Sequence, residues 1–364
     1  MQGDGLIPSS SFQKAFCDAL AAFWDEVQEQ FPSDTFAERL FHDLTEFTQR
    51  PGKRIRPWLF AEFYRLLGRE NWAEAGVMRA ALALELLHSF ILVHDDIIDR
   101  SVERRGRLSL HRLLALHFGK HKESLRLGES LAIVGGDILF ALAYKALLTS
   151  AFRPDLKVKA LLYLSSAILD TGCGEVLEIY TAARDLEAAS MDIIQKIYEL
   201  KTTRYTFIAP LRLAGILAEA DETLISKLEQ TLLPLGLLFQ IANDLDDFRR
   251  MRNELDSTDL SEGIKTILLR TAYDRLGEVE RTLLQLCLSD ATYHEGSFFR
   301  IVTLIEKSGA LGEIKRQKER LLSECIRRLE MLNDPDMQSR VYAIISRIGV
   351  ELSGVLVRGD GSRG

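Results

Sequence analysis

The chain is poor in residues that break helices and in motifs that mark other classes of protein. Only 8 of its 364 residues are proline, and alternating strand patterns are absent, which favours helix over strand. The cysteines are far apart in the sequence and form no CxxC pair, so neither a zinc site nor a disulfide framework is predicted. The net charge of −7 argues against a nucleic-acid-binding protein, which would usually be basic.

Targeting segments are also missing from the sequence. The N-terminus has no basic region followed by an apolar run, so it does not resemble a signal peptide. We read no uninterrupted apolar stretch of the ~18 residues needed to cross a bilayer, and we therefore expect no transmembrane segment and a cytoplasmic location. Residues 1–10 and 358–364 are small and polar without periodicity, and we expect both ends to be disordered.

Apolar residues recur at helical spacing through the rest of the chain. No linker rich in proline, glycine or serine divides it, so we predict one domain over residues 11–357. The expected fold is all-α, a single large bundle of ten or more helices. The segment 81–96 is apolar nearly all round, which is typical of a helix in the middle of a bundle.

Three carboxylates close this apolar segment: Asp95, Asp96 and Asp99. Asp95 and Asp99 are four residues apart and lie on one helix face, where like charges repel unless a cation binds. Carboxylate oxygens suit a hard ion such as magnesium, which also binds phosphate oxygens. The alternative is a solvated helix end, but aspartates there oppose the helix dipole.

A second acidic cluster follows about 150 residues later, at the end of another apolar run. It contains Asn243, Asp244 and Asp247, which helical spacing places near one another. One acidic cluster on a buried helix is weak support for a site. Two clusters from distant parts of the chain predict opposite walls of one cavity for metal and phosphate.

Cationic residues stand where such a site needs them. Lys53 and Arg56 flank the start of a predicted helix, where the positive dipole end and backbone N–H groups favour anions. Arg104 and Arg105 follow the first acidic cluster, and arginine forks match phosphate oxygens. Lys201 alone would be read as a surface charge.

Taken together, these motifs resemble the trans-isoprenyl diphosphate synthase (polyprenyl synthetase) family over most of the chain. The matching segments occur in the family's order: GKRIRP at 52–57, HDDIID at 94–99, RRG at 104–106, Gly136-Asp137, KTTRYTFIAPLRLAG at 201–215, FQIANDLDD at 239–247 and DLSEGIKT at 259–266. The resemblance implies a helical bundle around a central cavity, usually a homodimer. The implied activity is a prenyltransferase that joins isopentenyl diphosphate head to tail to an allylic diphosphate.

The resemblance also implies roles for individual residues. Magnesium, as three ions, would be held by the residues of the two clusters: Asp95, Asp96, Asp99, Asn243, Asp244 and Asp247. Isopentenyl diphosphate would bind without metal to Lys53, Arg56, His88 and Arg105. The allylic diphosphate would contact Arg104, Lys201, Gln240 and Lys265, and the catalytic candidates are Lys201, Thr202 and Gln240.

The chain departs from the family pattern mainly around the second cluster. Asn243 stands where the family usually has aspartate. The lysine that the family usually has after this cluster is missing from 251–258, and the nearby Arg249, Arg250 or Arg252 could substitute for it. Two alternatives therefore stay open: a class I terpene cyclase, and a weakly active regulatory subunit of a prenyl synthase. The cationic residues of the isopentenyl site argue against the cyclase.

Product length is expected to depend on the residues just before the first acidic cluster. In the family these residues form the floor of the pocket, and a helical turn rises ~5.4 Å, roughly one isoprene unit. The floor candidates are Leu87, Phe90 and Ile91. A bulky phenylalanine at 90 resembles short-chain synthases, so we predict a product of fifteen to twenty-five carbons, most simply geranylgeranyl diphosphate.

Overall fold

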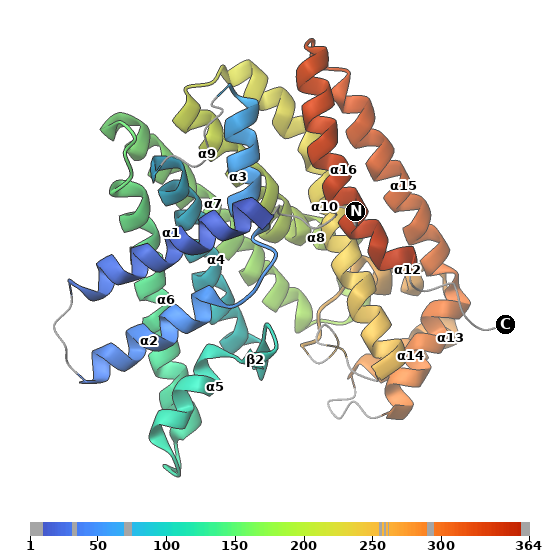
Figure 1. The fold of residues 1–364 in the computed structure, drawn as a ribbon. Helices are drawn as coiled ribbons and strands as arrows, with labels where there is room; N and C mark the ends of the chain where they lie inside the picture. Colours follow the sequence, from blue (N-terminus) through green and yellow to red (C-terminus); the bar gives the residue numbers. More distant parts are fainter. Residues whose placement is uncertain are drawn as a thin grey trace. The chain divides into compact units, whose positions relative to one another are not determined.

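A computed structural model describes residues 10–30, 35–68, 75–254, 257, 260, 262–289 and 295–357 (Figure 1). Nearly all of these residues are helical, which confirms the predicted all-α class with ten or more helices. The chain forms two compact units, which are described separately below. The first contains residues 1–162 and 213–219, and the second contains 163–212 and 220–364.

The predicted disordered ends lie outside the described residues, except that Ser10 begins the first helix. The single domain over 11–357 stays a prediction.

The first unit is built from long helices and one small hairpin. Its elements are α1 (Ser10–Gln28), α2 (Thr35–Gln49), α3 (Ile55–Leu66), α4 (Ala75–Ile98), β1 (Glu103–Arg104), β2 (Arg107–Leu108), α5 (Leu110–Ala115), η1 (Leu116–Phe118), α6 (Ser124–Leu148), the start of α7 (Pro154–Ala182) and most of α9 (Ala209–Ala218). The hairpin pairs Glu103 with Leu108 and Arg104 with Arg107, a short antiparallel pair that the sequence pattern did not predict.

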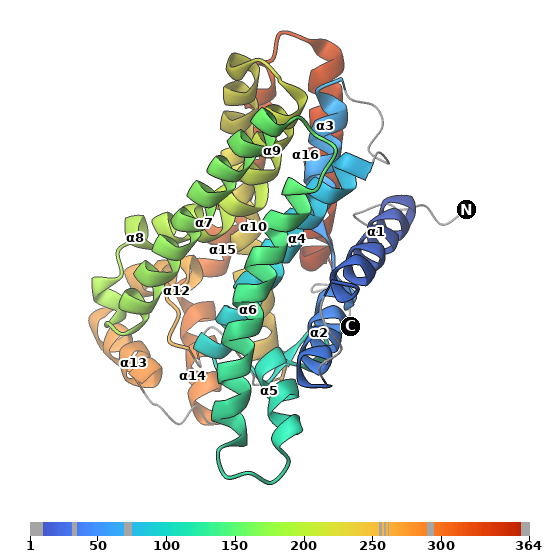
Figure 2. The same cartoon turned by 90° about the vertical axis from the view of Figure 1, so that its left-hand side faces the viewer.

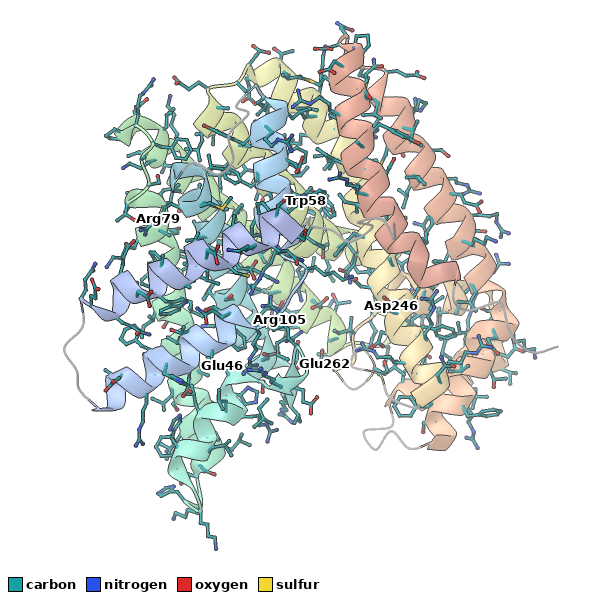
Figure 3. The ribbon with its side chains drawn as sticks, viewed as in Figure 1. Glu46, Trp58, Arg79, Arg105, Asp246 and Glu262 are labelled. Carbon is teal, nitrogen blue, oxygen red and sulfur yellow. The ribbon has the colours of Figure 1, made fainter. Side chains whose placement is uncertain are left out.

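The core of the first unit lies around α4, which packs against α6, α3 and α1 (Figure 2). Apolar residues of α1 at helical spacing, from Phe16 through Leu20 to Trp24, are fully buried. Trp24 Nε1 donates to Thr48 Oγ1 at 2.8 Å, which joins α1 to α2. Trp58 of α3 is also buried, and Figure 3 marks it among the side chains. The apolar segment 81–96 is therefore a core helix, as expected.

The second unit holds the remaining helices. They are the rest of α7 from Tyr163, η2 (Leu186–Ala188), α8 (Met191–Tyr198), η3 (Glu199–Ile208), the start of α9, α10 (Glu222–Glu254), α12 (Ile267–Arg275), α13 (Glu278–Ser289), α14 (Glu295–Ser308), α15 (Ala310–Leu329) and α16 (Pro335–Val357). α10 packs against α15 and η3, and η3 is a π-helix.

Two residues of α10 explain how this long helix fits its neighbours. Pro234 has no N–H to donate to the carbonyl of Gln230, four residues earlier. Arg328 of α15 fills that gap, since its Nη1 donates to the Gln230 oxygen at 2.6 Å. At Gly236, a Cβ would lie 2.4 Å from Thr203 Oγ1, so only glycine allows α10 to approach the π-helix this closely.

Three helices are long and apolar enough to cross a membrane by length and composition alone. They are α4 from Gly76 to Ile98, α6 and α7. By this measure, which tolerates single charged residues, our estimate of apolar length was too low, and the expectation of no transmembrane segment stays a prediction. The three helices differ in how much of their most apolar 18-residue stretch is buried: 72% in α4, 44% in α6 and 28% in α7. α4 is thus a core helix, whereas α6 and α7 keep exposed apolar faces.

Candidate active site

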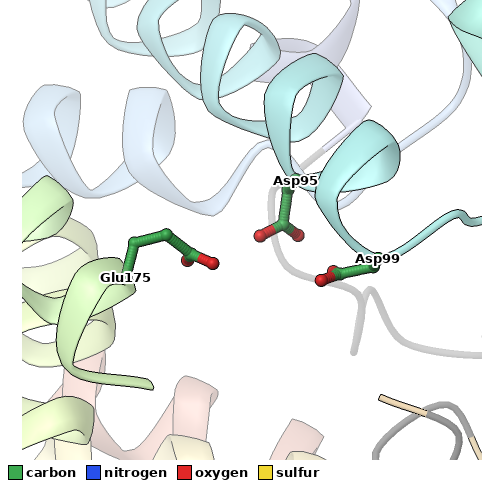
Figure 4. A group of neighbouring side chains, drawn as sticks. All are labelled: Asp95, Asp99 and Glu175. Atoms are coloured by element: carbon green, nitrogen blue, oxygen red, sulfur yellow. The ribbon is translucent and has the colours of Figure 1, made fainter. Parts of the chain in front are cut away.

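The last turns of α4 carry the first acidic cluster. The carboxylates of Asp95 and Asp99 lie within 4.8 Å of each other and project toward the same side (Figure 4), which confirms that they share a face. Asp96 points elsewhere and is fully buried, with its Oδ1 accepting from Arg104 Nε at 2.7 Å. Burial raises the pKa of Asp96, although its bond to Arg104 acts in the opposite direction.

The β1–β2 hairpin places Arg104 and Arg105 beside this helix end. The turn between the strands has positive φ at both Arg105 (57°) and Gly106 (73°), the combination that suits the twist of a two-residue hairpin. Arg50 anchors the hairpin, since its Nη1 donates to the carbonyl oxygens of Leu108 at 2.7 Å and Arg104 at 3.3 Å. The backbone of the hairpin therefore fixes the positions of Arg104 and Arg105.

The predicted isopentenyl diphosphate residues gather within the first unit. Lys53 is exposed just before α3 and Arg56 is half-buried in its first turn, while His88 on α4 lies close enough to Arg56 and Arg105 to feel their charges. Burial, followed by the positive charges of Arg56 and Arg105, holds the pKa of His88 well below its usual value. His88 is therefore neutral at physiological pH and can donate a hydrogen bond without adding charge.

An aromatic row lies between α4 and α6, next to the acidic cluster. The ring of Phe90 is 4.8 Å from that of His94 and 5.2 Å from that of Phe140 on α6. Phe140 is in turn 4.7 Å from Tyr144. A Cβ at Gly136 would lie 2.4 Å from His94 Nε2, so this glycine makes room for the row.

The other two floor candidates also lie on α4. Leu87 is fully buried and Ile91 is half-buried. Asp137, next to Gly136 on α6, places its Oδ1 3.7 Å from His94 Nε2.

In the second unit, Lys201 lies in the π-helix η3. Its Nζ is 2.6 Å from Glu175 and also pairs with Glu178, both on α7. Gly174 permits this approach, because a Cβ there would be 2.8 Å from Lys201 Cγ. π-Helical turns are frequent at functional sites, and here the wider turn carries the predicted catalytic residues Lys201 and Thr202.

Thr202, Gln240 and Asp244 form a continuous hydrogen-bonded row. Thr202 Oγ1 donates to Gln240 Oε1 at 2.9 Å, and Gln240 Nε2 donates to Asp244 Oδ1 at 3.1 Å. The hydroxyl of Tyr198 donates to Asp244 Oδ2 and accepts from the backbone N–H of Ile267 at 3.1 Å. Burial raises the pKa of Asp244 to about 7, against the lowering effect of these hydrogen bonds.

The remaining residues of the second cluster differ in exposure. Asp247 is buried and accepts from Ser257 and from Arg250, the latter at 2.7 Å. Asn243 is exposed and lines a cavity of about 490 Å³ together with Asp246, Arg249, Arg250 and Asn253. The predicted role of Asn243 as a metal ligand stays a prediction.

Lys265, predicted to contact the allylic diphosphate, binds backbone carbonyls, whereas Lys201 pairs with carboxylates. Its Nζ donates to the carbonyl of Gly263 at 2.7 Å and to that of Ala182 at 3.4 Å. Burial lowers its pKa. Its role toward substrate stays a prediction, and Asp259 and Ser261 of the same motif lie outside the described residues.

Sequence reasoning missed several residues that organise these sites. Glu85, buried on α4, pairs with Arg54 and with Arg105. It is the one charged residue inside the run ALALELL, and that isolation was a usable signal. Tyr198 and Ser257, which hold the second acidic cluster, gave no such signal, because an aromatic on an amphipathic helix and a serine in a loop are ordinary.

Comparison with known proteins agrees with the motif order. The model of the polyprenyl synthetase family matches residues 38–305. Geranylgeranyl diphosphate synthase of Saccharolobus solfataricus is 30% identical over 302 residues, covering 80% of this chain and 85% of the relative. The short chain isoprenyl diphosphate synthase of Methanocaldococcus jannaschii is 28% identical over 282 residues, 74% of this chain and 77% of the relative.

A solved structure shares the fold. Geranylgeranyl pyrophosphate synthase from Corynebacterium glutamicum, complexed with isoprenyl diphosphate and magnesium, has a TM-score of 0.80 and 24% identity, covering 93% of this chain and 98% of that chain. At this identity the likeness supports the helical fold alone.

The raised pKa of Asp244 predicts how pH affects the metal-free protein. In the unfolded chain this carboxyl titrates near ~3.9, so its charge makes folding less favourable as pH rises toward about 7. Without divalent metal, we expect the free energy of unfolding of Asp244→Asn to exceed that of the wild type by about 1–3 kcal/mol at pH 8. At pH 4 we expect no such gain.

Urea unfolding at both pH values measures this difference. Asp246→Asn is the matched control, because Asp246 is two residues away and half exposed. An equal response of the two variants at pH 8 would contradict the account of Asp244.

Proposed function

This chain belongs to the polyprenyl synthetase family, and we propose that it makes geranylgeranyl diphosphate. It is a prenyltransferase that forms a short-chain prenyl diphosphate by joining isopentenyl diphosphate head to tail to an allylic diphosphate. The observation that carries the proposal is the pairing of two features in the first unit. An acidic helix end and a separate group of cationic residues are both present.

The allylic diphosphate is the substrate that binds through metal. The close carboxylates of Asp95 and Asp99 repel each other unless a cation lies between them. These hard oxygen donors fit magnesium. Asp96 Oδ2 is buried without a hydrogen-bond partner among the described residues, so it too can serve a cation. Asp244, Asp247 and Asn243 would complete a set of three ions, with Arg104, Lys201, Gln240 and Lys265 contacting the diphosphate.

Isopentenyl diphosphate binds to positive side chains without metal. Lys53, Arg56 and Arg105 supply the charge, and neutral His88 supplies a hydrogen bond. Arginine forks match the phosphate oxygens and stay charged at all physiological pH values. Two diphosphates are thus held by two different chemistries, which keeps each substrate in its own place.

The reaction begins when the allylic C–O bond breaks and its electron pair leaves with diphosphate. Bound magnesium would offset the charge that develops on the leaving group. The double bond of isopentenyl diphosphate, oriented by Lys53, Arg56 and Arg105, attacks the allylic carbon and forms the new C–C bond. A proton is then lost to the released diphosphate, which restores the double bond. Lys201 and Gln240 hold the allylic diphosphate during these steps.

We further propose a cytoplasmic homodimer. Exposed apolar side chains on the part of α7 that belongs to the second unit support an association surface: Leu169, Val176 and Tyr180. Leu169 and Tyr180 are 70% and 66% exposed, and apolar residues exposed together on one helix are typical of an interaction surface. A second copy of the chain would cover these apolar residues.

Product analysis by mass with the purified chain alone tests the activity. With magnesium, isopentenyl diphosphate and an allylic diphosphate, we expect prenyl diphosphates up to twenty carbons. Asp99→Asn should lower kcat at least about 100-fold, because it removes a charge from the metal site. Asp18→Asn, an exposed change on α1, is the control and should leave kcat unchanged.

Two outcomes would contradict the proposal. A cyclic hydrocarbon would identify a terpene cyclase. An absence of turnover from the chain alone, restored only by a partner synthase, would identify a regulatory subunit.

Product length should depend on the aromatic row. Phe90→Ala opens space on α4 about one helical turn before Asp95, and ~5.4 Å per turn is roughly one isoprene unit. We expect the main product to lengthen by one or more units, and Phe140→Ala, which removes the ring behind Phe90, to shift it the same way but less.

Phe152→Ala is the control, because Phe152 packs against Tyr64, away from this row. Chromatography of the dephosphorylated products reads out the lengths. An unchanged distribution in Phe90→Ala would show that Phe90 is ordinary core.

A further inference from the structure

One carboxylate is buried at the centre of the first unit, between two arginines. The side chain of Glu85 is only 2% exposed, and its Oε1 pairs with Arg54 Nη1 and lies 3.2 Å from Arg105 Nη2. A charge in an apolar core is costly unless it is paired and hydrogen-bonded. Glu85 meets this condition only while both arginines stay where they are.

Both partners of Glu85 also have an unusual backbone. Arg54 and Arg105 adopt the left-handed conformation, with φ of 44° and 57°. Residues with a side chain rarely adopt this conformation and keep it only where the surroundings hold them there. Arg54 lies between Lys53 and the start of α3, and Arg105 forms the turn of the β1–β2 hairpin. One carboxylate thus forms ion pairs with two strained turns that come from distant parts of the sequence.

Further hydrogen bonds hold the side chains of Arg54 and Arg105 in place. Arg54 Nη2 donates to the carbonyl oxygens of Thr48 and Arg50, both at 2.7 Å, which fixes the end of α2. Arg105 Nη1 donates to the same Arg50 oxygen at 3.4 Å. A Cβ at Gly52 would lie 3.0 Å from Arg105 Cζ, so the loop before α3 and the hairpin are in contact. The two turns therefore form one rigid piece around Glu85.

We propose that Glu85 is the positioning residue of the isopentenyl diphosphate site. It does not touch the substrate. It fixes the direction of Arg105, and through Arg54 it fixes the turn that presents Lys53 and Arg56. This inference rests on the proposed function, because those three cations are taken to bind the diphosphate. A carboxylate is needed because a neutral side chain cannot offset the buried guanidinium charge of Arg54 and the half-buried one of Arg105.

Glu85→Gln tests the proposal, because it keeps the shape and removes the charge. We expect the KM for isopentenyl diphosphate to rise about tenfold or more, with kcat within about threefold of wild type and the KM for the allylic substrate unchanged. Calorimetry with isopentenyl diphosphate and no metal should show the same loss in Kd. An unchanged Kd with a lower melting temperature would overturn the proposal, since Glu85 would then be structural only.

Two further variants separate positioning from stability. Glu85→Gln/Arg54→Gln removes both charges of the buried pair, so it should recover much of the lost thermal stability but not the affinity for isopentenyl diphosphate. Recovery of wild-type affinity in this double variant would overturn the proposal. Glu26→Gln breaks the ion pair between Glu26 of α1 and Arg79 of α4, and as the matched control it should leave both KM values unchanged.

Failure of the proposed function gives a different result. A wild-type chain that binds isopentenyl diphosphate but makes no product contradicts the proposed function, while the binding comparison still decides the role of Glu85. A wild-type chain that makes product, with unchanged affinity in Glu85→Gln, contradicts the role of Glu85 alone.

Discussion

The first unit depends on how a single carboxylate is accommodated in an apolar helix. α4 is buried on most of its surface, and the Glu85 carboxylate is paired there with Arg54 and Arg105, as a charge in an apolar core requires. Satisfying that charge brings the start of α3 and the β1–β2 hairpin to the same place. In our proposal, the ion pairs that compensate the buried charge of Glu85 also position the cations of the isopentenyl diphosphate site.

In the second unit, a buried carboxyl group is compensated by hydrogen bonds and not by ion pairs. Asp244 is buried, and the chain supplies Tyr198 and Gln240 as its donors. Burial still dominates and raises its pKa to about 7, so its charged form is disfavoured at the pH where most carboxylates are ionised. The π-helix makes the arrangement possible, because its wider turn lets Thr202 reach Gln240 on α10. Lys201 meanwhile is neutralised by Glu175 and Glu178.

Sequence alone predicted what periodicity and motif order encode: the helical class, the core position of α4 and the shared face of Asp95 and Asp99. It could not predict features set by tertiary contact. The π-helix at Lys201 packs closely against Gly236 and Gly174, and the buried Asp96 is paired with Arg104 of the hairpin. The apolar length of α6 and α7 was underestimated, because single charged residues interrupt runs that remain apolar on average.

The central claim is that two diphosphates bind by different means, one through metal and one through cationic side chains. Calorimetry of the wild-type chain with each substrate, with and without magnesium, tests it most directly. The account predicts that isopentenyl diphosphate binds with similar affinity in both conditions, whereas a non-reactive allylic diphosphate analogue binds only when magnesium is present. Equal dependence of both ligands on magnesium would contradict it, as would tight binding of the allylic analogue in the presence of a chelator.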